Sequence, residues 1–245
     1  PPIAWYILLT DKGKLLLSKC IKNLLYENDN HFLSVKSRIF TTFANHYSSD
    51  KNSKDYINES IEIKKQLSDK PGLARSYGSL SRLLFTENPI SNETLEATKQ
   101  WFIINEENKD IFGIIFSRNF LGKIYFNIYK TNQSKVNNLK NSKQQYNENI
   151  RLLNNKIDQG SQIQIFTSFA DLMEIAKFEK DENTFLDLSN KLYNLLKDFE
   201  KIENKFFIDI FKNAFSSKFK NAVYSKQNIK EIFNWMFLLW TKQMK

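Results

Sequence analysis

The sequence has little glycine and proline. Its 245 residues include 6 glycines and 4 prolines, about a third of the share found in an average protein. Neither Asn-Gly nor Asp-Gly occurs, although these pairs form the tightest hairpin turns. Sandwiches, barrels and doubly wound sheets depend on frequent turn residues. The composition therefore argues against them and predicts an all-α fold of long helices joined by polar corners.

Cysteine is almost absent. The single cysteine, Cys20, excludes an internal disulfide framework and a zinc site built on cysteines. It lies in the segment LLLSKCIKNLLY, where we expect a buried thiol that packs as a small apolar side chain. This cysteine usage predicts a reducing, cytoplasmic location.

Long apolar runs are also missing. No apolar run reaches the roughly 18 residues of a membrane-spanning helix. The start of the sequence also has no basic region and no cleavage site typical of a signal peptide. We therefore expect no membrane association. The chain starts with Pro-Pro instead of Met, from which we expect a piece of a longer protein.

Positive charge is in excess but arginine is rare. The chain has 36 Lys and Arg against 27 Asp and Glu, a net charge of +9. Abundant Lys, Asn, Ile, Phe and Tyr resemble the coding bias of an AT-rich genome, so part of the charge is compositional background. The charge still attracts acidic partners at long range. Only five arginines occur: Arg38, Arg75, Arg82, Arg118 and Arg151.

Apolar residues recur with helical spacing along most of the chain. Residues 56–67 place one apolar stripe on a helix face, and Lys64 falls on that same side. Residues 111–128 are apolar on more than one side, as in a helix packed between neighbours. Such helices with short corners between them predict successive antiparallel hairpins. The corners lie at 48–55, 68–72, 87–93, 107–110, 130–135 and 155–161.

The chain contains an internal repeat. A shift of 41 residues superposes Leu80 on Leu121 and Ser81 on Gly122. Two further copies centre on Ala44 and Ala170, so the small residues are separated by 37, 41 and 48 positions. A small residue lets a partner helix approach closely. We therefore expect the small residues at all four positions to face helix crossings.

The segment LGKIYF at 121–126, with the corner SDKPG at 68–72 before the preceding copy, resembles the tetratricopeptide repeat family. The resemblance implies a right-handed α-solenoid of antiparallel helical hairpins. The spacings here are longer than the family period of about 34 residues and are unequal. We expect one domain over 1–245, with a partial leading hairpin at 1–30, repeats at 35–69, 71–108, 111–156 and 159–203, and a closing hairpin at 204–245.

Catalytic signatures are missing from the sequence. It has no Gly-x-Gly-x-x-Gly, no phosphate-binding loop and no His-Glu-x-x-His. The two histidines, His31 and His46, lack the neighbours of a triad or a metal site. We therefore expect no enzyme activity, no metal and no cofactor.

The arginines are the most informative group of polar residues. In the resembled family, the first helix of each repeat lines a concave groove. Arginine there suits bidentate binding of carboxylate or phosphate, although the same arginines could instead pair with internal Glu. Carried over residue by residue, the resemblance places these partner-binding residues in a basic groove: Arg38, Asn45, Arg75, Arg82, Phe85, Phe116, Asn119 and Lys123.

The sequence thus predicts a protein- or peptide-recognition module, the sensor or scaffold portion of a larger regulatory protein, that binds an acidic segment. One alternative is a helical repeat that binds the nucleic-acid backbone, although unequal spacings disfavour a base-reading code. Another is a non-catalytic helical portion of a larger enzyme. The sequence does not indicate an oligomeric state.

Overall fold

The computed structural model describes residues 10–24, 29–152 and 159–199. Within these ranges all regular structure is helical and no strand occurs, so the expected all-α class is confirmed. The chain divides into two compact units, residues 1–117 (unit 1) and 118–245 (unit 2). The closing hairpin expected at 204–245 lies outside the described residues.

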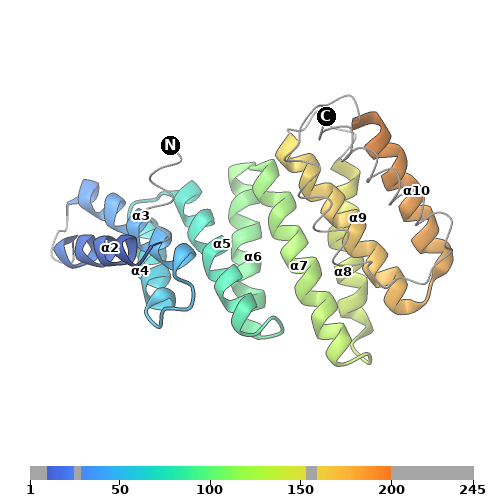
Figure 1. Cartoon of the computed structure of the whole chain (residues 1–245), viewed down its shortest axis with the longest axis horizontal. Coiled ribbons are helices and arrows are strands. Elements are labelled where there is room, and N and C mark those ends of the chain that lie inside the picture. The colour runs from blue at the N-terminus through green and yellow to red at the C-terminus, as the bar shows by residue number, and fades with distance from the viewer. Residues whose placement is uncertain (1–9, 25–28, 153–158, 200–245) are drawn as a thin grey trace. The chain divides into compact units, whose positions relative to one another are not determined.

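The helices of each unit follow one another with short connections (Figure 1). In unit 1, α3 packs on α4, α5 on α6 and α4 on α5; in unit 2, α8 packs on α9 and α9 on α10. Helix α7 contains the boundary between the units. The bounds are α2 Asp11–Leu24, α3 Asn30–His46, α4 Ser53–Gln66, α5 Lys70–Glu87, α6 Asn92–Asn108, α7 Ile111–Thr131, α8 Val136–Arg151, α9 Gln159–Glu179 and α10 Glu182–Phe199.

Each range that the sequence assigned to a repeat holds one pair of helices. The range 35–69 contains α4 and most of α3, which begins five residues earlier, at Asn30. Local capping explains where the helices begin. The Asp69 carboxylate accepts a hydrogen bond from the Gly72 amide at the start of α5, and Ser91 Oγ accepts one from the Thr94 amide at the start of α6.

The core of unit 1 joins its two hairpins. Ile57 and Ile61 of α4 share one buried cluster with Leu80 and Leu84 of α5 and with Ala97 of α6. A second cluster lies between α3 and α4, around the fully buried ring of Phe40, which stacks on Tyr56. Because α4 packs on both α3 and α5, this helix fixes how α3 and α5 lie relative to one another.

The small residues at 44, 81, 122 and 170 are all buried. Two of them contact the following helix directly. Ser81 Oγ lies 2.6 Å from Thr98 Oγ1 of α6, and a Cβ atom on Gly122 would lie 2.5 Å from Cζ of the Tyr146 ring on α8. These contacts bring the two helices of a hairpin close together.

The expectation of a buried thiol at Cys20 is wrong. Cys20 is exposed, and Leu15 and Leu16 of the same helix are also more than half exposed. The segment is apolar on several sides, so the sequence could not indicate which side of α2 faces α3, the helix against which it packs.

Replacement of Gly122 by alanine is expected to destabilise unit 2 by about 1–3 kcal/mol because the new methyl group overpacks against the Tyr146 ring. At an open helix position the same change stabilises by about 0.5–1 kcal/mol. Urea unfolding followed by circular dichroism measures the effect, with Lys140→Ala at an exposed α8 position as the control.

In a Tyr146→Leu background, which shortens the side chain facing Gly122, Gly122→Ala should cost clearly less. An unchanged unfolding midpoint for Gly122→Ala alone would show that the α7–α8 contact is not tight.

Candidate functional site

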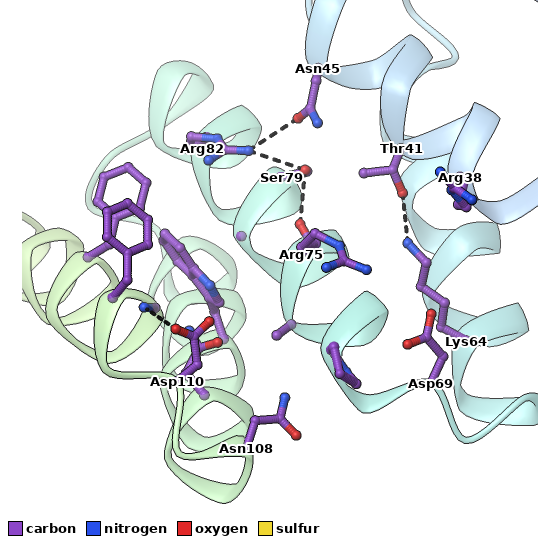
Figure 2. A pocket seen from close by; sticks show the side chains of 18 of the residues that line it. Arg38, Thr41, Asn45, Lys64, Asp69, Arg75, Ser79, Arg82, Asn108 and Asp110 are labelled. Carbon is purple, nitrogen blue, oxygen red and sulfur yellow. Dashed lines mark hydrogen bonds between the residues drawn. The ribbon is translucent and has the colours of Figure 1, made fainter. Parts of the chain in front are cut away.

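A pocket of about 950 Å³ opens on unit 1, a volume in the upper part of the range for ligand-binding sites. Figure 2 shows the labelled residues that line it. We call it the unit 1 pocket. It is lined by Ser34, Arg38, Thr41, Thr42 and Asn45 of α3, Lys64 of α4, Asp69 of the following loop, Pro71, Ala74, Arg75, Gly78, Ser79 and Arg82 of α5, Trp101, Asn105 and Asn108 of α6, and Asp110, Phe112, Gly113 and Phe116 at the start of α7.

The unit 1 pocket brings together five of the eight residues that the sequence assigned to a groove: Arg38, Asn45, Arg75, Arg82 and Phe116. Phe85 is half-buried on α5 and does not line it. Both Asn119 and Lys123 belong to unit 2.

The two groove residues of unit 2 are engaged within that unit. Asn119 is 1% exposed, and its Oδ1 accepts hydrogen bonds from Ser168 Oγ at 2.6 Å and from Asn149 Nδ2 at 3.0 Å. Its Nδ2 donates to the Gln164 carbonyl at 2.8 Å. Burial lowers the pKa of Lys123, whose amine lies 5.8 Å from the centre of the Phe120 ring.

Two arginines in the unit 1 pocket have no side-chain partner among the residues that the structure describes. Both Arg38 and Arg75 are exposed, and neither guanidinium group forms an ion pair or hydrogen bond with a residue that the structure describes. Among the described residues, neither arginine therefore pairs with an internal Glu, which was the alternative left open by the sequence. Arg82 is half-buried and donates long hydrogen bonds, each of 3.3 Å, to Asn45 Oδ1 and Ser79 Oγ (Figure 2).

The two carboxylates that line the pocket are occupied as helix caps. Asp69 Oδ1 accepts a hydrogen bond of 2.9 Å from the Gly72 amide of α5. Asp110 Oδ1 accepts one of 3.0 Å from the Gly113 amide of α7. Both carboxylates therefore already serve helix N-termini. Four cationic side chains line the same pocket, so positive charge is in excess there.

The fourth cation, Lys64, is buried in a network of hydroxyl groups. Its side chain is 3% exposed, and its amine donates to Thr41 Oγ1 at 3.0 Å and to Ser76 Oγ at 2.7 Å. Ser60 Oγ lies 2.9 Å from Thr41 Oγ1 and 3.1 Å from Ser76 Oγ. Ser60 Oγ also donates a hydrogen bond of 2.8 Å to the Ser37 carbonyl of α3, so the network connects α3, α4 and α5.

Burial lowers the pKa of Lys64 from about 10.5 to about 8. Two opposing charge effects are smaller. The Asp69 carboxylate raises the pKa, whereas the positive charges of Arg75 and Arg38 lower it further. The three cations are thus close enough to repel one another across the pocket.

Aromatic rings and amides line the pocket on α6 and α7. Trp101 meets Phe116 edge to face with ring centres 5.3 Å apart, and Phe112 lies 5.8 Å from Phe116. Phe112 is 40% exposed, whereas Asn105 is 1% exposed. This wall carries no cationic side chain, so the pocket has a basic part and an aromatic part.

Sequence reasoning missed Lys64, Trp101, Asn105 and Phe112 as pocket residues. A signal existed for Lys64, because a lysine on the apolar side of residues 56–67 is unusual. Phe112 and Trp101 have the helical spacing of core residues, and nothing local distinguishes a ring that lines a pocket.

The described residues contain no cluster of His, Cys, Asp or Glu that could bind a metal ion. Likewise, none of the described helices is long and apolar enough to cross a membrane. No protein-family model and no curated protein sequence matches the chain.

Lys64 is expected to titrate near pH 8, well before the exposed Lys65, whose pKa is raised by its hydrogen bond to Glu62. Side-chain NMR of labelled lysines measures both. Because the unfolded chain holds this proton up to about pH 10.5, it binds more protons than the folded state between pH 8 and 10.5. The contribution of Lys64 to the free energy of unfolding should therefore rise with pH over that window.

Substitution of Ser76 by alanine removes a hydrogen bond to the charged amine and should lower the pKa of Lys64 further. Titration of Lys64 together with Lys65, well above pH 8, would contradict the buried position of its amine.

Proposed function

We propose that the chain is a non-catalytic recognition module that binds an acidic protein segment in the unit 1 pocket. The observation that carries this proposal is the pair of exposed guanidinium groups of Arg38 and Arg75, which have no ion-pair or hydrogen-bond partner among the described residues, beside the buried amine of Lys64. Cations that repel one another gain from an anion between them. Arginine forks also match carboxylates bidentately.

The spacing of the arginines supports an extended ligand with several acidic groups. Arg75 and Arg82 are seven residues apart on α5, which separates their Cα atoms by about 10 Å along the helix. A peptide segment with acidic residues at intervals can place a separate carboxylate at each guanidinium group.

We also propose that the helical pairs form a tetratricopeptide-like, right-handed solenoid. Support comes from the four ranges that each hold one helical pair and from the buried small residues at 44, 81, 122 and 170. In such an array the pocket residues of α3 and α5 are first-helix residues of successive repeats, as the resemblance implies.

A protein segment fits the unit 1 pocket better than a nucleic-acid backbone does. Asp69 and Asp110 lie in the pocket wall, where they would repel a continuous row of phosphates. A peptide can place neutral residues beside these two carboxylates. The aromatic rings of Trp101 and Phe116 likewise suit side chains of a peptide.

Charge reversal tests the proposal. The probe is a fluorescein-labelled eight-residue peptide in which glutamate alternates with serine, titrated by fluorescence anisotropy at two salt concentrations. The double variant Arg75→Glu/Arg82→Glu should weaken binding by about tenfold or more. The affinity of the unaltered chain should fall as salt rises.

The matched control is Lys51→Glu/Lys140→Glu, which changes the net charge equally at exposed positions outside the pocket. This control should bind within about threefold of the unaltered chain, since surface charges far from the ligand are screened. Equal losses in both double variants would refute a specific pocket. Tighter binding of single-stranded DNA of equal charge, lost in Arg75→Glu/Arg82→Glu, would favour nucleic acid instead.

A further inference from the structure

The aromatic part of the unit 1 pocket contains a polar group without a partner. Nδ2 of Asn105 is buried and donates no hydrogen bond to any residue that the structure describes. The residue is 1% exposed, yet it lines the pocket. Buried donors without an acceptor are rare in folded proteins. An amide left unpaired at a pocket wall is therefore a specific indication of a ligand acceptor.

The position of the Asn105 amide is fixed by the first turn of α7. A Cβ atom on Gly113 would lie 2.6 Å from both Cγ and Oδ1 of Asn105, so the glycine leaves the space that the amide fills. The Gly113 amide itself is capped by Asp110. The Gly113 amide at the start of α7 thus already has an acceptor, the Asp110 carboxylate. The donor that lacks an acceptor among the described residues is Nδ2 of Asn105.

Apolar surface surrounds this donor. A Cβ atom on Gly78 would lie 2.8 Å from Cε2 of Trp101, so the indole packs directly on the α5 backbone. Phe116 contacts the Trp101 indole edge to face. Phe112 contacts Phe116 in turn and is 40% exposed. An exposed phenylalanine beside two partly covered rings offers a surface for another large apolar side chain.

We propose that this part of the unit 1 pocket is a specificity subsite for a large apolar residue of the bound acidic segment, with a backbone carbonyl of that segment accepting a hydrogen bond from Asn105 Nδ2. The inference rests on the proposed function. It adds that acidic residues alone are not the recognised feature. The ligand joins carboxylates, bound by Arg38 and Arg75, to an apolar side chain placed against Phe112 and Phe116.

The distribution of charge in the unit 1 pocket supports a separate apolar subsite. Its four cationic side chains belong to α3, α4 and α5, whereas α6 and the start of α7 contribute rings, amides and the capping Asp110. A purely acidic segment would place carboxylates beside Asp110, where like charges repel one another. A segment with an apolar residue at that end avoids this repulsion and buries that residue against the exposed ring of Phe112.

Two labelled peptides test the subsite: four glutamates alternating with serine followed by Ser-Phe, and the same sequence ending in Ser-Ala. The unaltered chain should bind the phenylalanine peptide at least about fivefold more tightly, in line with burial of one large apolar side chain. Phe112→Ala should bring that ratio below about two, whereas Asn105→Leu should weaken the binding of both peptides because both carry the backbone carbonyl. Ile103→Ala, at an exposed α6 position outside the pocket, should keep the ratio.

A direct readout accompanies the titrations. The side-chain amide signal of Asn105, assigned by its loss in Asn105→Leu, should shift downfield with the phenylalanine peptide in heteronuclear NMR. Phe112 is 40% exposed, whereas Asn105 is 1% exposed, so Phe112→Ala disturbs the packing less and remains a usable variant if Asn105→Leu does not fold.

The outcomes separate the two proposals. Equal affinity of the unaltered chain for both peptides would overturn the subsite and leave the acidic-segment function standing. A preference for phenylalanine that persists undiminished in Phe112→Ala, or unchanged affinity of both peptides for Asn105→Leu, would overturn its location. Binding of neither peptide would overturn the proposed function and the subsite together.

Discussion

The amine of Lys64 holds α3, α4 and α5 together at one point, and the candidate site is built around it. The amine donates hydrogen bonds to the hydroxyl groups of Thr41 and Ser76. The hydroxyl group of Ser60 lies within hydrogen-bond distance of both. No carboxylate forms an ion pair with the amine among the described residues. Hydroxyl dipoles stabilise the charge without neutralising it. The wall of the pocket therefore keeps a positive charge that would be lost if an Asp or Glu took the place of one hydroxyl.

Small side chains at the helix contacts make this arrangement possible. Ser60 and Ser76 are fully buried between helices, where a larger residue would push α3, α4 and α5 apart and break the hydrogen bonds to Lys64. Gly122 allows the same closeness between α7 and α8, where the Tyr146 ring fills the space. The two units thus use one rule, small residues at the crossing, with a polar network in one case and a ring in the other.

The fold was predictable because its signals are local. Scarce glycine, polar corners and helical spacing each act within about twenty residues, and the repeat ranges 71–108 and 111–156 each contain a helical pair. Part of the site was predictable as well, since Arg75 and Arg82 share one face of one helix. Asn119 could not be placed, because its burial depends on Ser168, 49 residues away. The unpaired amide of Asn105 depends on the turn that brings Gly113 against it, and no sequence pattern records that contact.

Binding and protonation are coupled in such a pocket. The pKa of Lys64 is held near 8 by burial and by Arg75 and Arg38. An acidic ligand at the two arginines screens that repulsion and adds a nearby negative charge, and both effects raise the pKa. If the chain binds such a ligand as proposed, it would take up protons near pH 8 on binding, and by linkage its affinity would fall as the pH rises through that region. A ligand that binds the folded state alone would also stabilise it. The cations of the unit 1 pocket, unfavourable together in the free chain, would thus become favourable in the complex.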